Sequence, residues 1–109
     1  MRRDHIAFII VNWNGMAFLP DCFRSIVGSA PALAYEVVVV DNVSTDGSRE
    51  WLVSDETAQI FPNGQLRTIL SDENLGFGRA NNLAIRETDS EFVFILNPDT
   101  TVRSGAVDR

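Results

Sequence analysis

The chain has 109 residues, of which 45% are apolar and 22% charged, as in a single globular domain. Fifteen acidic residues against nine basic ones, all of them arginine, give a net charge of −6. No basic run is present, which argues against a nucleic-acid partner. No apolar run approaches the roughly 20 residues of a membrane-spanning helix. The single cysteine, Cys22, excludes an intramolecular disulfide and suits a reducing compartment, so we expect a cytoplasmic location.

Short apolar runs predict four β-strands. Runs rich in Val, Ile and Phe at residues 6–11, 37–40 and 92–96 are typical of strands buried on both faces of a parallel sheet. A weaker apolar run at residues 66–70 contains two polar residues, Arg67 and Thr68, which suits a strand at the edge of a sheet.

Apolar residues with helical spacing fill the gaps between these strands. The first helix begins near Pro20, because proline is tolerated in the first turn, and it ends at residue 28. Two more helices are predicted at residues 48–54 and 77–87, and the start of another at 104–107.

The resulting order, β-α-β-α-β-α-β, predicts a parallel α/β sheet with right-handed crossovers. The strand at 92–96 is wholly apolar, unlike an edge strand, and the chain then turns towards another helix. We therefore interpret residues 1–109 as one truncated domain in which this strand is left at an edge; a complete four-stranded fold is the alternative. An uncovered apolar strand also predicts self-association.

The loops after the four strands predict where a ligand binds. In open α/β sheets, ligands bind beyond the carboxyl ends of the strands. The loops at those ends, residues 12–15, 41–47, 71–78 and 97–99, are rich in Asn and Asp. The polar tips therefore predict one shared site.

Several familiar ligand-binding motifs are incomplete in this chain. Residues 76–81 begin like a dinucleotide-binding fingerprint, but Asn81 replaces the third glycine, and the absence of lysine excludes a P-loop. The segment after residue 42 imitates a calcium loop without its final glutamate. One Cys and one His make a structural zinc site implausible, and His5 precedes a strand at the wrong end of the sheet for a catalytic triad.

Four motifs together resemble a known family. They are IIVNWNG, VVVVDNVSTDGS, ENLGFGRANN and FILNPDT, in the family's order and spacing. From residue 6 to about residue 107, the chain resembles the N-terminal, nucleotide-binding half of a family 2 glycosyltransferase, in its rhamnosyltransferase-like branch. The resemblance implies the GT-A fold: a three-layer α/β/α arrangement with a parallel sheet in the order 3-2-1-4.

The resemblance also implies an activity for the parent enzyme. It is an inverting transfer of a sugar, with rhamnose suggested, from a dTDP- or UDP-linked donor to a hydroxyl of a glycan or lipid-linked acceptor. Such enzymes serve cell-wall or polysaccharide biosynthesis, in the cytoplasm or at the inner face of the membrane. In the family, the general base is a carboxylate of the C-terminal half. We therefore expect no catalytic residue in this chain, weak nucleotide binding at most, and no turnover by the chain alone.

The resemblance implies a metal cofactor as well. Mn²⁺ or Mg²⁺ neutralises the charge that develops on a departing diphosphate, and both ions prefer oxygen ligands. Where the family usually has Asp-x-Asp, this chain has Asn97 and Asp99 around Pro98. Asp99 is thus the implied metal ligand, and Asn97 the implied partner of ribose or sugar.

Asp41, at the end of the second strand, is the implied nucleoside ligand. The other implied nucleotide contacts lie in the first three loops and the following helix: Val11, Trp13, Asn14, Ser44, Asn74, Gly76, Asn81 and Asn82.

Each of these residues also has a plainer interpretation. Asp41, Ser44 and Asp46 could cap the second helix, and Asn74 could only form a turn. Trp13 could be a core residue. Residues 97–99 could likewise be a simple turn, while Arg79 is favoured as a solvated helix residue and Cys22 as core.

Two rival functions follow from the same fold class. A non-catalytic nucleotide- or protein-binding module needs only the polar cleft. A flavodoxin-like signalling domain needs an acidic cluster at the first strand's tip, where Asn12 and Asn14 are neutral.

Overall fold

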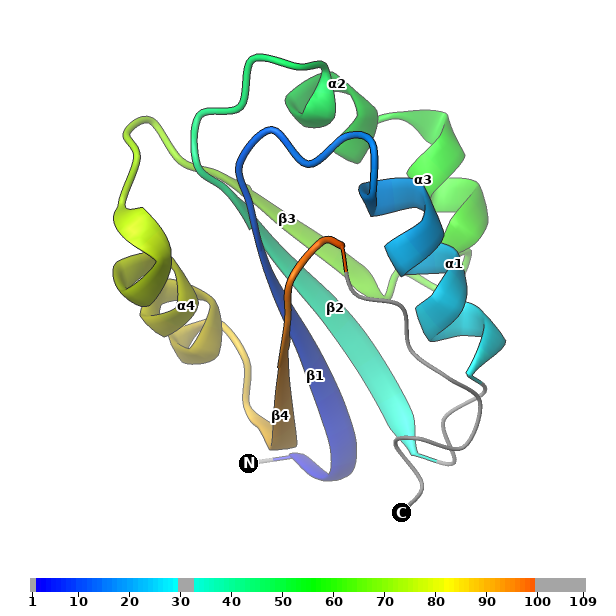
Figure 1. Cartoon of the computed structure of the whole chain (residues 1–109). Coiled ribbons are helices and arrows are strands. Elements are labelled where there is room, and N and C mark those ends of the chain that lie inside the picture. Colours follow the sequence, from blue (N-terminus) through cyan, green and yellow to red (C-terminus); the bar gives the residue numbers. More distant parts are fainter. Residues whose placement is uncertain (1, 30–32, 100–109) are drawn as a thin grey trace.

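A computed structural model describes residues 2–29 and 33–99 of the chain. Its four strands form one parallel sheet in the order β3-β2-β1-β4, with parallel pairing throughout (Figure 1). The strands are β1 (Arg2–Asn12), β2 (Ala34–Asp41), β3 (Leu66–Leu70) and β4 (Ser90–Leu96). The helices are α1 (Leu19–Gly28), α2 (Ser48–Leu52), α3 (Asp55–Ile60) and α4 (Gly76–Arg86). The predicted fold class and strand order are confirmed.

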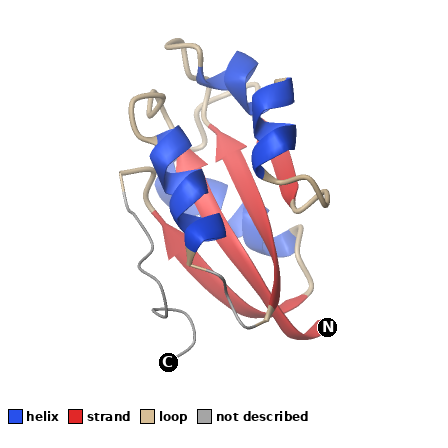
Figure 2. Ribbon diagram, turned by 90° about the vertical axis from the view of Figure 1, so that its right-hand side faces the viewer, coloured by secondary structure: helices blue, strands red, loops and turns tan. Residues whose placement is uncertain are grey.

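Helices cover both faces of the sheet and form three layers (Figure 2). Successive strand residues point to opposite faces, so β1 contributes to two cores. Ile6, Phe8 and Ile10 pack with α1, α2 and α3, whereas Ala7 and Ile9 pack against α4. Both cores are built from apolar side chains, which explains why the strands are continuous apolar runs. Among the described residues, no helix is long and apolar enough to cross a membrane.

The predicted second helix is in fact two short helices. α2 ends at Leu52, and a separate helix, α3, begins at Asp55. Thr57 stabilises the break, because its hydroxyl donates to the Ser54 carbonyl at 2.9 Å and contacts the Leu52 carbonyl at 3.2 Å. The sequence of α3, DETAQI, is too short and too polar to show a helical repeat of apolar residues. This helix was not predicted because it is too short to show a helical pattern of apolar residues.

β1 begins earlier than the apolar run predicted. Arg2 ties its first residues to the sheet through Glu36 at 2.9 Å and Asp89 at 2.6 Å. The hydrogen bond from Arg2 lowers the pKa of Asp89. His5 therefore lies inside β1 and not before it, with its Nδ1 2.5 Å from Ser90 Oγ. It still lies at the amino end of the sheet, away from the polar tips.

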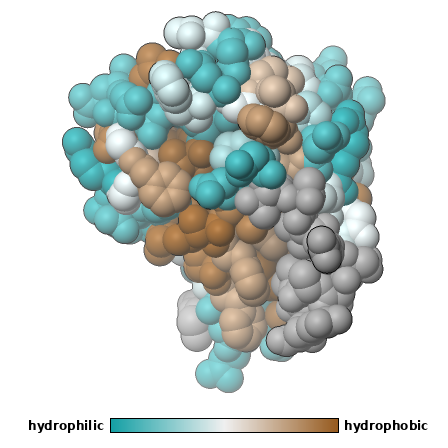
Figure 3. Space-filling model, in the orientation of Figure 1, coloured by the Kyte–Doolittle hydropathy of each residue, from teal (hydrophilic) through white to brown (hydrophobic). Residues whose placement is uncertain are grey.

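The two sheet edges differ in character. β3 is one edge, as its polar residues predicted, and β4 is the other. Successive β4 residues from Phe92 to Ile95 are exposed, and an apolar band follows β4 in the space-filling view (Figure 3). The expectation that an interior-type strand lies at an edge is confirmed for the part of the chain described. The predicted helix at 104–107 lies outside the described residues.

Candidate functional site

A cavity of about 480 Å³ lies beyond the carboxyl ends of the strands. It is lined from all four tips, by Val11, Trp13, Gly15, Phe18, Asn42, Asn74, Gly76, Phe77, Asn97, Pro98 and Asp99. The prediction that the four polar loops converge at one edge of the sheet is confirmed, because all four line this cavity. Trp13 is 61% exposed and is therefore no core residue.

Gly15 lets the loop after β1 pass close to the turn after β4. A Cβ at this position would clash with Asn12 Oδ1 and lie 3.1 Å from Pro98 Cβ. Asn12 cannot give way easily, because it is fully buried and its amide nitrogen donates to Asp41 and Ser44. Only glycine fits, and the close packing brings both segments to the same wall of the cavity.

Asn42 was missed by the sequence analysis and lines the cavity. Its side chain anchors the start of α4: Oδ1 accepts from the Leu75 N–H at 3.2 Å, and Nδ2 donates to the Gly76 carbonyl at 3.3 Å. Gly76 has φ +73°, a conformation that favours glycine. Asn74 lines the cavity and also forms a turn, since its Oδ1 accepts from the Gly76 N–H at 2.8 Å. In the sequence, the one feature that could have indicated a cavity-lining role for Asn42 is its position next to Asp41.

Asp41 lies behind the cavity wall and is fully buried. One carboxylate oxygen accepts from Asn12 Nδ2 at 2.8 Å and Ser44 Oγ at 2.7 Å. The other accepts from the Ser44 N–H at 3.0 Å and Arg49 Nη1 at 3.1 Å. The carboxylate thus makes four internal hydrogen bonds, and its role as nucleoside ligand stays a prediction.

Ser44 is buried and Asn14 is exposed, and neither lines the cavity; together they join the first two loops. The Asn14 N–H donates to Ser44 Oγ at 2.8 Å, and the Thr45 N–H donates to Asn14 Oδ1 at 2.7 Å. Asp46 accepts from the N–H groups of Met16 and Ser48, at 2.9 and 3.0 Å. Burial opposes ionisation of Asp46, but the hydrogen bonds from Ser48 and Met16 outweigh it and lower its pKa. Gly47 is the N-cap of α2, so Asp46 stands one residue before the cap, and its bonds to Ser48 shape the turn that leads into the helix.

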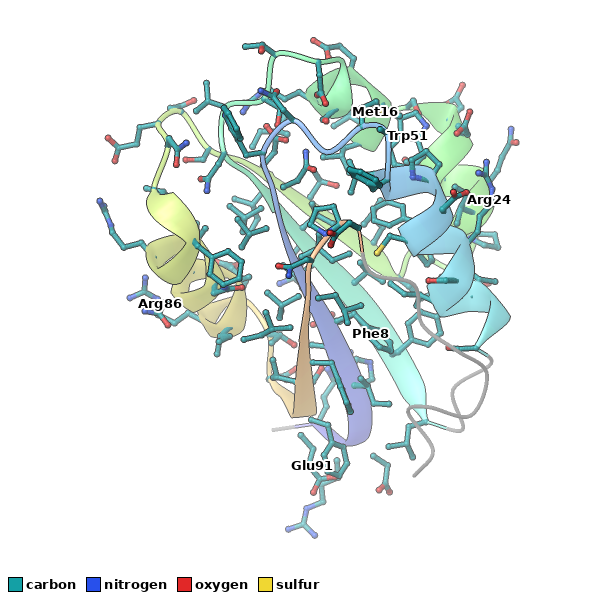
Figure 4. All side chains as sticks on the ribbon, viewed as in Figure 1. Phe8, Met16, Arg24, Trp51, Arg86 and Glu91 are labelled. Atoms are coloured by element: carbon teal, nitrogen blue, oxygen red, sulfur yellow. The ribbon has the colours of Figure 1, made fainter. Side chains whose placement is uncertain are left out.

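The two implied ligands on α4 lie away from the cavity. Asn81 is buried, and its Oδ1 has no hydrogen-bond partner among the residues that the structure describes. Asn82 is exposed and shares the outer face of α4 with Arg79 and Arg86; Figure 4 shows Arg86 pointing away from the sheet. Arg79 is mostly exposed and 3.9 Å from Glu73, as expected for a solvated helix residue.

Asn97 and Asp99 present oxygen ligands at the cavity wall. No group of three or more His, Cys, Asp or Glu residues gathers within residues 2–29 and 33–99. One carboxylate is still compatible with Mg²⁺ or Mn²⁺, because such ions commonly complete their shells with substrate phosphates and water. The Asp99 side chain also acts on Cys22 in the core: burial, and then the Asp99 charge, raise the pKa of that thiol to about 11.

No basic side chain lines the cavity within the described part of the chain. A bound diphosphate would therefore meet Asp99 with no cation from the described residues to offset either charge. A divalent cation between them removes this repulsion, so the donor set and the charge of the cavity both fit one.

Comparison with known proteins places this geometry in a family. The profile of glycosyl transferase family 2 matches residues 7–109. The low-salt glycan biosynthesis hexosyltransferase Agl10 of Haloferax volcanii is 32% identical over 103 residues. The teichoic acid poly(glycerol phosphate) polymerase of Staphylococcus epidermidis is 26% identical over 104 residues. These alignments cover 91% and 95% of this chain but 29% and 14% of the relatives, so the chain spans less than a third of either protein.

Solved structures agree in fold. Residues 1–349 of S. aureus TarS superpose with a TM-score of 0.77 at 21% identity, over 94% of this chain and 30% of that one. The mannosyltransferase PcManGT from Pyrobaculum calidifontis, solved with GDP-Man and Mn²⁺, gives a TM-score of 0.75 at 27% identity, over 86% of this chain and 27% of that one. The fold is that of GT-A glycosyltransferases, and the chain belongs to glycosyl transferase family 2.

Proposed function

We propose that this chain forms the donor-nucleotide site of an inverting glycosyltransferase that moves a sugar from a nucleoside diphosphate to an acceptor hydroxyl. The observation that carries the proposal is the cavity beyond the sheet, to which all four strand tips contribute and which Asp99 borders. The family membership, the hexosyltransferase relative and the GDP-Man complex of PcManGT support it.

In this proposal, the nucleoside lies between the loop that follows β1 and the first residues of α4. Trp13 offers an exposed aromatic face to the base, and Val11 supplies apolar contact. Asn42 and Asn74 supply polar groups, and the Gly76 backbone allows close approach. Direct contacts from Asp41, Asn14, Ser44, Asn81 and Asn82 remain predictions. For Asp41, such a contact requires the carboxylate to exchange an internal partner.

The diphosphate lies in this proposal against the turn after β4. Asp99 would hold a divalent cation, Mn²⁺ or Mg²⁺, and Asn97 would donate to ribose or sugar. When bound, the cation neutralises the charge that develops on the leaving diphosphate. The cavity walls orient the donor and exclude water from one side of it.

Nucleotide titration with Asp99→Ala tests this assignment. For the unaltered chain, we expect Mn²⁺ to tighten UDP or dTDP binding by about ten-fold or more, because it removes the repulsion between Asp99 and the diphosphate. Asp99→Ala should lose the metal dependence, whereas Asp21→Ala, on exposed α1 surface, should keep it. Calorimetry measures both. Metal-dependent binding that survives in Asp99→Ala would contradict the metal site; no binding by any variant favours the non-catalytic module.

The remaining parts of the activity are proposed for the parent enzyme. Residues 1–109 would be the donor part of a GT-A domain, and the general base would lie in sequence that this chain does not contain. We propose dTDP-rhamnose as the donor and a glycan or lipid-linked acceptor, at the inner face of the membrane in the cytoplasm. Sugar transfer at a normal rate by this chain alone would contradict the proposed division.

We also propose that two copies associate through β4. The outer edge of β4 has no strand partner among the described residues, and Phe92–Ile95 carry no charge that would oppose pairing. In an antiparallel pair centred on Phe94, Val93 faces Ile95 of the second copy. We expect light scattering to give a mass that rises with concentration, and Ile95→Lys to keep the chain monomeric. A monomer at all concentrations without the substitution would contradict the pairing.

A further inference from the structure

Arg49 lies at the carboxyl edge of the sheet but does not line the cavity. It is the second residue of α2, and its side chain is 25% exposed. One guanidinium nitrogen, Nη1, donates to Asp41 Oδ2 at 3.1 Å and to the Ser71 carbonyl at 2.9 Å. Asp41 ends β2 and Ser71 follows β3, so one side chain joins the tips of two neighbouring strands.

The bond to Asp41 matters because that carboxylate is fully buried. Within the described residues, Arg49 is the one basic residue with an ion pair to Asp41; the other partners, Asn12 and Ser44, are neutral. A buried carboxylate needs both hydrogen bonds and a countercharge. Without Arg49, Asp41 would be driven to draw water or to leave its position.

From Asp41, a chain of hydrogen bonds leads to the loop that carries Trp13. Ser44 Oγ donates to Asp41 and accepts from the Asn14 N–H at 2.8 Å. Asn12 Nδ2 donates to both Asp41 and Ser44. The residues on either side of Trp13 are thus fixed, although its own ring is mostly exposed at the cavity.

We propose that Arg49 is a positioning residue for the donor-nucleotide cavity. It acts through Asp41 and Ser44 to hold the Trp13 loop, and it touches no ligand itself. The inference rests on the proposed function, since it concerns the wall on which the nucleoside would lie. Arg49 also holds the tip of β3, where the loop leading to Asn74 begins.

The first test follows the loop without any nucleotide. The chain has two tryptophans, so a Trp51→Phe background leaves Trp13 as the only reporter. In that background, we expect Arg49→Met to lower the Trp13 anisotropy and raise acrylamide quenching by up to about 1.6-fold, the ratio of full to present exposure (61%). Adding Asp41→Asn removes the uncompensated charge but replaces one acceptor oxygen by a donor, so it should restore part of the signal.

Arg67→Met is the matched control. Like Arg49, Arg67 donates to a backbone carbonyl, that of Glu87, and its Nη1 lies 3.9 Å from the Glu87 carboxylate. Arg67 lies, however, at the opposite end of the sheet. Its loss should leave the Trp13 signal unchanged. An unchanged signal in Arg49→Met, or an equal change in both arginine variants, would overturn the proposal. If Arg49→Met does not fold, Arg49→Lys, which keeps the charge but not the planar group, should show a smaller change of the same sign.

The second test separates this inference from the proposed function. We expect Arg49→Met to weaken UDP or dTDP binding on the order of ten-fold while Arg67→Met leaves it unchanged, since misplaced walls lose affinity without losing the fold. If Arg49→Met lowers the Trp13 anisotropy as expected but no variant binds nucleotide, the proposed function alone would be overturned. Normal nucleotide binding by Arg49→Met together with a normal Trp13 signal would overturn the positioning role alone.

Discussion

Replacing Gly15 by alanine is expected to abolish measurable nucleotide binding and to lower the free energy of unfolding by about 1–3 kcal/mol, as overpacking does. The added methyl group would clash with Asn12 Oδ1 and press on Pro98. Asn12 cannot swing away without releasing Asp41 and Ser44, and Pro98 cannot move without carrying the turn that holds Asp99. The clash therefore opens the cavity wall whichever partner moves.

Gly28→Ala is the control for this prediction. Gly28 lies in the last turn of α1, and a Cβ there would meet no atom of the described residues within 4 Å. Alanine is the better helix former, so this variant should be neutral or slightly more stable. Calorimetric titration with UDP or dTDP and urea unfolding measure both effects. Unchanged nucleotide affinity in Gly15→Ala would mean that the packing of the two loops does not shape the site.

Phe23→Ala is expected to cost about 3–5 kcal/mol of the free energy of unfolding, the range for removing a buried phenylalanine ring. Phe23 is fully buried on α1, and its ring centre lies 5.2 Å from those of both Trp51 and Phe61. One side chain thus joins α1 to the α2–α3 segment. A chain of this length has only about 5–15 kcal/mol of stability in all, so the loss is a large fraction.

Urea unfolding followed by tryptophan fluorescence measures this loss, because Trp51 touches the substituted site. Val53→Ala serves as the control, since Val53 is 65% exposed and its truncation should change stability by less than about 0.5 kcal/mol. Equal stability losses in Phe23→Ala and Val53→Ala would show that the three helices do not depend on this aromatic contact.

The fold was predictable because its signals are independent of one another. The apolar runs of β1 and β2 are unbroken, each has helix-spaced residues after it, and the right-handed crossover rule leaves few arrangements. Position in the sheet was also readable, since polar Arg67 predicted that β3 is an edge strand. The short α3 carried no such signal, because its six residues contain only two apolar side chains, Ala58 and Ile60.

The place of the cavity was predictable from the sequence, but its lining was not predictable in detail. The polar tips predicted the edge of the sheet at which the cavity lies, and Trp13, Asn97 and Asp99 line that cavity. Asp41 and Asn42 are neighbours of similar size, and their sequence does not say which one faces the cavity. The observed answer depends on Asn12 and Arg49, which hold Asp41 inside, and on Leu75, which pairs with Asn42. Such long-range partners cannot be read from local sequence.

A chemical-shift map of the amide signals, recorded as UDP or dTDP is added with Mg²⁺, tests the nucleotide cavity most directly. We expect the largest shifts at Trp13, Asn42 and Gly76, with Mn²⁺ in place of Mg²⁺ broadening signals nearest Asp99 first. The amino end of the sheet, around Arg67 and Glu87, should stay unchanged. Shifts confined to that opposite end, or no shifts at millimolar nucleotide, would contradict a donor site at the carboxyl edge.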